Sequence, residues 1–193
     1  MTWWQSIDLT LFQWINSDLG NPFFDAVLPL FREKWFWAPF YLFIVSFIWQ
    51  NFSRKKSLLL LLGLVFSVAL ADFTSSNLLK KNVQRIRPCN DPLLEHVVQL
   101  RVSCGSGYSF TSSHAANHFA VAVYLCLVFS FLGPWWCTGL LIWAFVVAIS
   151  QVYVGVHYPG DVLGGGVLGV AIGWWTGYTV RRWIALPRGK KTS

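Results

Sequence analysis

The sequence predicts an all-α protein, a single membrane-embedded bundle of about six helices over residues 1–193. Hydrophobic residues make up 55% of the chain and charged residues only 12%, a balance too apolar for an ordinary soluble domain. Five apolar stretches are near the length of about 20 residues that crosses the hydrocarbon of a bilayer. The 15 Lys and Arg residues lie mostly in short clusters between and after these stretches.

Residues 1–34 are predicted to form two amphipathic helices that lie in the membrane interface. Apolar residues recur there at helical spacing, while acidic and amide side chains interrupt every apolar window. Asn21-Pro22 marks the break between the two helices. A short, tilted first membrane helix is the alternative. No Lys or Arg precedes Arg32, so we expect no cleaved signal peptide.

Clear membrane spans are expected over the ranges 36–52, 58–79, 115–132, 136–156 and 162–180. Arg54-Lys55-Lys56 forms a basic loop after the first range, and a basic tail at 181–193 follows the last. Because positively charged loops tend to stay in the cytoplasm, both should be cytoplasmic. The loop at 80–113 and the turn around His157 then lie together on the outer face, the periplasmic face of a bacterial-type inner membrane.

Four glycines recur every fourth residue in the last span: Gly165, Gly169, Gly173 and Gly177. A stripe of this kind lets another helix approach closely. We assign it to packing inside the bundle in preference to a dimer interface, and the oligomeric state stays open.

The outer loop carries basic residues contrary to the usual charge bias, namely Lys80, Lys81, Arg85, Arg87 and Arg101. We expect an anionic ligand there, with contact to lipid headgroups as the alternative. Lys80 and Arg87 are suited to converge on a phosphate, one as a point charge and the other as a bidentate fork. Nucleic acid is a poor candidate partner, because the basic clusters are separated by apolar runs of membrane length.

A hydroxyl-rich segment, Ser109-Phe110-Thr111-Ser112-Ser113-His114, directly precedes the third span. Small hydroxyl residues that open a helix leave backbone N–H groups free to bind an anion. A serine hydroxyl can add a donor to this anion, and His114 would stand beside it in the first turn. The alternative is an ordinary Ser/Thr cap followed by an interfacial histidine. His118 lies one turn further on, but without a nearby carboxylate the histidine pair is weak evidence for a metal.

His157 and Asp161 are separated by Tyr-Pro-Gly, a turn signal between two apolar stretches. The carboxylate is placed to cap the next helix and to hold the imidazole, which frees the other ring nitrogen to attack an electrophile. Taken alone, the segment is equally well a polar turn. Its position on the same face as the cations and His114 favours phosphoryl transfer, in which one histidine attacks and the other protonates the leaving oxygen.

These residues resemble, in order and spacing, the three motifs of the type 2 phosphatidic acid phosphatase family, the membrane relatives of vanadium haloperoxidases. The motif Lys-x6-Arg-Pro is complete as Lys80 to Pro88. Pro-Ser-Gly-His reads Thr111-Ser112-Ser113-His114. Ser-Arg-x5-His-x3-Asp reads Ser150-Gln151, five residues, His157, three residues, Asp161. The match covers residues 80–161.

The resemblance implies that His157 is the nucleophile that becomes phosphohistidine, that Asp161 orients it, and that His114 is the general acid. It implies phosphate binding by Lys80, Arg87, Ser112, the backbone of Ser113 and, at the motif's arginine position, Gln151. It implies no metal and no cofactor.

Gln151 is the serious departure from the family pattern, because an amide lacks the charge and the bidentate fork of arginine. Loss of one preorganised donor typically costs about 10²- to 10³-fold in rate. Arg85 or Arg101 is a candidate substitute; alternatively, Gln151 is an engineered change that traps a bound state.

The function implied by the resemblance is metal-independent hydrolysis of a lipid phosphomonoester or diphosphate on the outer face. Phosphatidic acid, phosphatidylglycerol phosphate, undecaprenyl diphosphate and the phosphates of lipid A are all candidate substrates. A non-catalytic lipid-phosphate binder or transporter on the same scaffold is the alternative, motivated by Gln151. A haloperoxidase would need a soluble chain.

Cys89 and Cys104 share the outer loop and face an oxidising compartment, so we predict a disulfide between them. Closing a loop of about 15 residues would stabilise the fold by roughly 3 kcal/mol and shape the loop over the site. Cys126 and Cys137 lie in or beside apolar segments and are expected to be free thiols.

Overall fold

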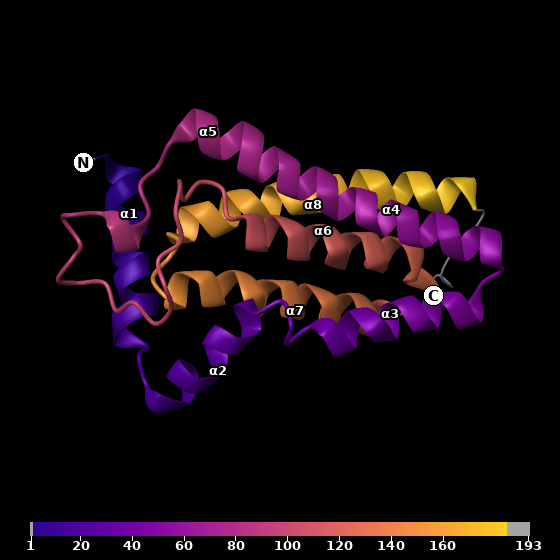
Figure 1. Ribbon diagram of the computed structural model, residues 1–193, viewed down its shortest axis with the longest axis horizontal. Coiled ribbons are helices and arrows are strands. Elements are labelled where there is room, and N and C mark those ends of the chain that lie inside the picture. Colours follow the sequence, from indigo (N-terminus) through magenta and orange to yellow (C-terminus); the bar gives the residue numbers. More distant parts are fainter. Residues whose placement is uncertain (1, 185–193) are drawn as a thin grey trace.

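The computed structural model describes residues 2–184, and in this range all regular structure is helical, as predicted. The long helices run side by side along the molecule in Figure 1: α3 (Ala38–Asn51), α4 (Arg54–Phe73), α6 (Ser113–Val128), α7 (Pro134–Tyr153) and α8 (Pro159–Trp183). Two helical stretches are long and apolar enough to cross a membrane, Arg54–Val83 and Pro134–Tyr153. The basic cluster predicted at 188–191 lies outside the described residues.

Helix α4 carries the chain to the end of the bundle where the predicted site lies. α4 continues through a π-helical stretch, η2 (Thr74–Leu79), into the short α5 (Lys80–Val83). Gln84 then adopts a left-handed conformation, with φ +53°, and ends the helix. The loop that follows passes through the short 3₁₀ helix η3 (Pro88–Asn90) and folds back over the end of the bundle (Figure 1).

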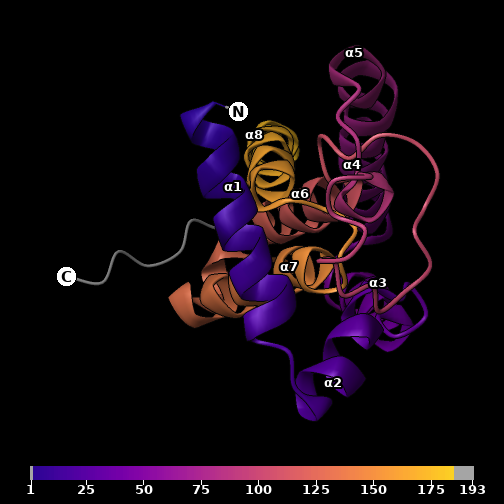
Figure 2. The same cartoon turned by 90° about the vertical axis from the view of Figure 1, so that its left-hand side faces the viewer.

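The N-terminal region forms α1 (Trp3–Gln13), which continues as η1 (Trp14–Asp18), and then α2 (Pro22–Arg32). The break falls at Asn21, as predicted, where the side chain caps α2 by accepting a hydrogen bond from Phe24 N (3.0 Å). Figure 2 looks along the bundle and shows α1 lying across its end, over α7 and α8. The N-terminal region therefore covers the end that holds the predicted site.

The glycine stripe of α8 packs against α6, which confirms the predicted packing inside the bundle. A Cβ at Gly169 would lie 2.3 Å from the Ala116 carbonyl oxygen, and one at Gly165 would lie 2.4 Å from the Ser112 carbonyl oxygen. The space between the two helices at these positions is therefore too small for any side chain larger than the hydrogen of glycine. The start of α6 is thus held close to the start of α8, where Asp161 lies.

The structure contains the predicted disulfide between Cys89 and Cys104, with Cα atoms 6.0 Å apart. It also joins Cys126 to Cys137, so the expectation of free thiols at these positions was wrong. The reason is the tight reversal between α6 and α7 through η4 (Ser130–Leu132), which brings the two Cα atoms to 4.9 Å, within the range of a disulfide.

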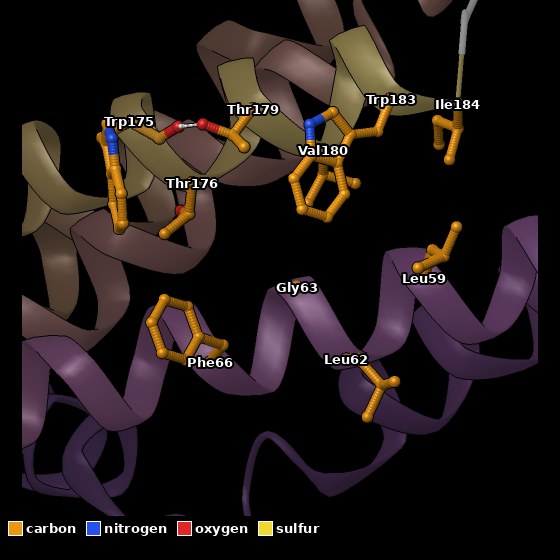
Figure 3. Close-up of a pocket in the computed structure, with 10 residues that line it drawn as sticks. All are labelled: Leu59, Leu62, Gly63, Phe66, Trp175, Thr176, Thr179, Val180, Trp183 and Ile184. Atoms are coloured by element: carbon orange, nitrogen blue, oxygen red, sulfur yellow. Dashed lines mark hydrogen bonds between the residues drawn. The ribbon is translucent and has the colours of Figure 1, made fainter.

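An apolar pocket of about 360 Å³ lies between α4 and α8, toward the end of α8 that is remote from the predicted site (Figure 3). The Thr176 and Thr179 hydroxyls in it donate to carbonyls of their own helix, at 2.8 Å each. No lining residue carries a charge, so this pocket offers nothing to hold a phosphate.

Candidate active site

The turn between α7 and α8 positions the two residues at the centre of the predicted site. Gly155 has φ +88° there, a conformation that favours glycine, and a side chain at this position would meet Val98 of the outer loop at 2.9 Å. The loop therefore packs directly on the turn. His157 is 2% exposed and Asp161 is fully buried.

Two hydrogen bonds hold the Asp161 carboxylate at the start of α8. Oδ2 accepts from the Tyr158 N–H (2.8 Å), and Oδ1 accepts from Arg85 Nη1 (2.9 Å). Oδ2 also lies 3.6 Å from His157 Nδ1, which has no hydrogen-bond partner among the described residues. The carboxylate thus faces one ring nitrogen and leaves Nε2 for other partners.

Burial lowers the pKa of His157 to about 4, although the nearby Asp161 carboxylate acts in the opposite direction. The positive charges of Arg87 and Lys80 add to the lowering. The imidazole is therefore neutral near neutral pH, the form in which a ring nitrogen has a lone pair to donate.

Arg87 lies on the Nε2 side of His157. Its Nη1 is 3.5 Å from His157 Nε2 and donates to the Val156 carbonyl (3.2 Å), while Nε donates to the Gly107 carbonyl (3.2 Å). No carboxylate pairs with Arg87 among the described residues. The loop thus fixes a guanidinium, with its charge uncompensated, next to the nitrogen that would attack phosphorus.

Lys80 opens α5 and is half-buried. Its ammonium group lies close enough to Arg87 and Asp161 for the charges to act on one another. Within the described part of the chain it forms no hydrogen bond and no ion pair. Lys80 and Arg87 are therefore two cations on one side of the site, both available to an anion.

The start of α6 is tied to the turn between α7 and α8 through Ser112. The Ser112 N–H donates to the Asp161 carbonyl (3.0 Å), and its hydroxyl caps α6 by accepting a hydrogen bond from Ala115 N (3.4 Å). The Ser113 hydroxyl is engaged by the hydroxyls of Ser75 (2.9 Å) and Ser76 (3.0 Å), on η2. The predicted helix start is thus present, and Ser113 has only its backbone left for a ligand.

His114 follows in the first turn of α6. Its carbonyl accepts a hydrogen bond from His118 Nδ1 (2.8 Å), and the two imidazoles are nearly parallel, with ring centroids 6.4 Å apart. His114 lies close enough to His157 for the two charges to interact. The two histidines assigned to catalysis therefore face one site from α6 and from the α7–α8 turn.

Gln151 is buried in the last turn of α7, and its side chain points back along its own helix. Nε2 donates to the Val147 carbonyl and to the Ser150 hydroxyl, at 3.3 Å each, whereas Oε1 has no partner among the described residues. The Gln151 carbonyl accepts from the His157 N–H (3.2 Å). Gln151 thus supports the turn through its backbone.

The two arginines considered as substitutes for the missing motif arginine both have carboxylate partners. Arg85 binds Asp8 (2.6 Å) as well as Asp161, and Arg101 binds Asp25. Sequence reasoning missed Asp8, whose Oδ1 also accepts from the Gly160 N–H (2.7 Å). An acidic residue in an apolar amphipathic helix was the available signal.

Within residues 2–184, no group of three His, Cys, Asp or Glu side chains is arranged to hold a metal ion. What the site presents is a buried neutral imidazole with a carboxylate on one side and a guanidinium on the other, plus a second histidine. Such a set can perform nucleophilic attack on phosphorus with a separate proton donor for the leaving group.

Comparison with known proteins identifies relatives. The PAP2 superfamily model matches residues 58–185. The chain is 32% identical to a lipid A 4'-phosphatase of Bacteroides thetaiotaomicron over 170 residues, which span 87% of this chain and 74% of that protein. It is 33% identical to phosphatidylglycerophosphatase B of Bacillus subtilis over 130 residues, covering 63% and 57% of the two chains.

Solved structures show the same fold. The crystal structure of Aquifex aeolicus LpxE superimposes with a TM-score of 0.65 at 27% identity, covering 88% of this chain and 94% of that one. A PAP2-type phosphatidylglycerolphosphate phosphatase from Bacillus subtilis superimposes with a TM-score of 0.66 at 23% identity, covering 100% and 90%.

Proposed function

We propose that this chain, which belongs to the PAP2 superfamily and is a phosphatase, removes phosphate from a membrane lipid. The reaction would proceed through a phosphohistidine intermediate and without a metal ion. The observation that carries the proposal is the environment of His157. Its imidazole is buried and neutral, faces Asp161 through Nδ1, and has Arg87 3.5 Å from Nε2.

In the first chemical step, His157 Nε2 attacks phosphorus and the bond to the leaving oxygen breaks. His114 donates a proton to that oxygen, so that the lipid leaves as an alcohol or, from a diphosphate, as a monophosphate. Asp161 stabilises the positive charge that the His157 ring gains. Lys80, Arg87, the Ser112 hydroxyl and the backbone at Ser113 hold the phosphate oxygens.

In the second step, water attacks the phosphorus of phosphohistidine while His114, now deprotonated, accepts its proton. The nitrogen–phosphorus bond breaks, inorganic phosphate is released, and His157 returns to its neutral form. Every proton is returned within the cycle, and the two histidines account for both steps.

We place the protein in the inner membrane of a bacterial-type cell, as one domain with the site on the periplasmic face. The apolar helices, the basic loop at Arg54-Lys55-Lys56 and the basic residues Arg181 and Arg182 at the other end of the molecule support this orientation. The predicted loop over the site is held by the Cys89–Cys104 disulfide, which suits an oxidising compartment.

A lipid substrate is supported by an apolar groove of about 920 Å³ between α1, α7 and α8. Gly160, in the first turn of α8, and Asp8 line one part of it, and the rest is almost entirely apolar. We assign this groove to acyl chains, because the phosphate they carry would then reach His157. Two relatives named lipid A 4'-phosphatase make the 4'-phosphate of lipid A the first substrate to test.

The test is inorganic phosphate release in detergent from lipid A, phosphatidylglycerol phosphate, phosphatidic acid and undecaprenyl diphosphate, with and without chelator. We expect turnover that chelator does not reduce, and its loss in His157→Ala. The exposed His96 offers a matched control, since His96→Ala should retain the parent rate. The mechanism is contradicted if chelator abolishes phosphate release by the parent, or if His157→Ala keeps full activity.

A non-catalytic lipid-phosphate binder or transporter is the second candidate, favoured by the neutral Gln151 side chain, which bonds to its own helix. Gln151→Arg separates the two functions. If neither the parent nor this variant hydrolyses any lipid but both bind it, the binder is correct. If only Gln151→Arg turns over, the chain is a disabled phosphatase.

A further inference from the structure

Arg32 carries a buried donor for which residues 2–184 provide no acceptor. It is the last residue of α2, and its Nη1 is buried without a hydrogen-bond partner among the described residues. Burial lowers the pKa of Arg32, and the charge of the adjacent Glu33 offsets this only in part. Because a guanidinium keeps its proton in proteins, this burial is costly unless an anion binds.

A row of aromatic contacts connects the end of α2 with the helix that carries His114. Trp37 Nε1 donates to the Phe31 carbonyl (2.7 Å), and the Trp37 ring lies 5.5 Å from Trp143 of α7. Trp143 in turn lies 5.0 Å from His118, one turn after His114. Figure 1 shows α2 ending beside α7, and the two helices are in contact. The end of α2 is therefore connected, through these rings, to the helix that carries His114.

The charge of Arg32 acts on two residues of the site, His114 and Arg87. Arg87 contacts the His157 ring from the outer loop, and Arg32 acts on Arg87 from the end of α2. Arg85 and Arg101 are bound to carboxylates, whereas Lys80, Arg87 and Arg32 form no ion pair within residues 2–184. Lys80 and Arg87 act on His157, and Arg32 acts on His114 and Arg87. These three cations without an ion-pair partner among residues 2–184 favour an anion with more than one negative charge.

We propose that Arg32 is a phosphate-binding residue, which donates to a nonbridging oxygen of the phosphoryl group that His157 attacks and supplies the charge that Gln151 lacks. This inference rests on the proposed function, because it takes the transferred phosphate as the anion. Arg32 is thus the third cation of the site, contributed by the N-terminal region.

The experiment compares Arg32→Met, Arg32→Lys and Arg32→Met/Gln151→Arg with the parent, using the full chain in detergent. Arg54→Met is the matched control, because Arg54 is exposed at the far end of the bundle. Two quantities are measured for each protein: the Kd of orthovanadate, a phosphate mimic, by calorimetry, and phosphate release from the lipid panel. Melting temperature is recorded with and without orthovanadate.

For Arg32→Met we expect kcat/KM to fall about 10²-fold or more and orthovanadate to bind more weakly, with Arg32→Lys intermediate. Adding Gln151→Arg to Arg32→Met should restore part of kcat/KM and part of the affinity for orthovanadate. Without ligand, Arg32→Met should melt at or above the parent temperature, because an unpaired buried charge is removed. Arg54→Met should match the parent throughout.

Parent-like catalysis and vanadate affinity in Arg32→Met overturn the assignment while leaving the phosphatase proposal intact. A lower melting temperature with unchanged vanadate affinity makes Arg32 structural and also overturns it. If the parent binds orthovanadate, Arg32→Met weakens this binding and no lipid is hydrolysed, the assignment stands and the phosphatase proposal fails. If the parent neither binds nor hydrolyses, both are wrong.

Discussion

Arg85 Nη1 lies 2.9 Å from Asp161 Oδ1, and the same guanidinium reaches Asp8 through Nη2 at 2.6 Å. The Arg85 guanidinium also stacks on the Tyr158 ring at 4.0 Å. One arginine of the outer loop thus joins α1 to the start of α8. Because Asp161 is fully buried, its carboxylate relies for hydrogen bonds on Arg85 and on the Tyr158 N–H.

Removal of Arg85 should therefore affect both stability and catalysis. Breaking a buried ion pair costs about 3–5 kcal/mol, and we expect Arg85→Met to fall near the lower end because Arg85 is 28% exposed. Asp8→Asn should cost less, since Asp161 keeps its partner, but it should still lower kcat. Chemical denaturation in detergent measures the first effect, with the exposed Lys81→Met as control. Equal stability of both variants would contradict this account.

The lowered pKa of His157 predicts how stability depends on pH. In the unfolded chain the imidazole titrates near 6.5, whereas in the folded protein its pKa is about 4. Between these values the unfolded state holds more protons, so stability falls as pH falls from about 6.5 to about 4. The full effect is on the order of 3 kcal/mol.

Melting temperatures of the parent and His157→Gln between pH 7 and 4 measure this contribution. The parent should lose more stability over the window than the variant, because glutamine does not titrate. His96→Gln serves as control, since that side chain is exposed and should leave the parent slope unchanged. Parallel curves for parent and His157→Gln would show that His157 is not held neutral by burial.

The Cys89–Cys104 disulfide closes a loop of 15 residues, for which chain entropy predicts roughly 3 kcal/mol of stabilisation. The loop it closes is adjacent to Gly107, whose carbonyl accepts from Arg87 Nε. We therefore expect Cys89→Ser/Cys104→Ser to melt at a lower temperature and to show a raised KM. Alkylation and mass spectrometry of the unreduced parent provide the direct check, and free thiols at both positions would refute the prediction.

The order of the motif residues made the site predictable, because His157 and Asp161 lie on one short turn and Ser112 opens a helix. These are local patterns, and local patterns survive folding. Asp8 was not predicted as a site residue, since it reaches the start of α8 from the N-terminal region through tertiary packing alone, and the same holds for the role that we propose for Arg32. Cys126 and Cys137 were misjudged for a related reason: hydropathy suggests burial but gives no distance between helix ends.

The positions of the long helices could be predicted from hydropathy, but not all of the contacts between these helices could be. The stripe at Gly165 to Gly177 indicated a close helix neighbour, and the structure identifies it as α6. The path of the chain from α5 into the outer loop depends on the left-handed conformation of Gln84, which is uncommon outside glycine and asparagine and left no signal in the sequence.

The contact between α8 and α6 predicts a sharp contrast between two glycines in apolar helices. A Cβ at Gly169 would lie 2.3 Å from the Ala116 carbonyl oxygen, whereas one at Gly139 of α7 would meet nothing within 4 Å. Gly169→Ala should destabilise by about 1–3 kcal/mol, because a backbone atom must move. Gly139→Ala should be neutral or stabilise by up to about 1 kcal/mol through helix propensity. Thermal unfolding in detergent distinguishes the two.

Gly165→Ala extends this argument to catalysis. Its Cβ would lie 2.4 Å from the Ser112 carbonyl oxygen, so α6 must shift at the residue whose N–H bonds the Asp161 carbonyl. We expect this variant to lose kcat/KM beyond its loss of stability, whereas Gly173→Ala, which meets Ala120 farther along α6, should lose stability alone. Phosphate release at a temperature where both variants remain folded separates the effects. Equal activity losses would mean that the α6–α8 contact positions the site as a whole and not through Ser112.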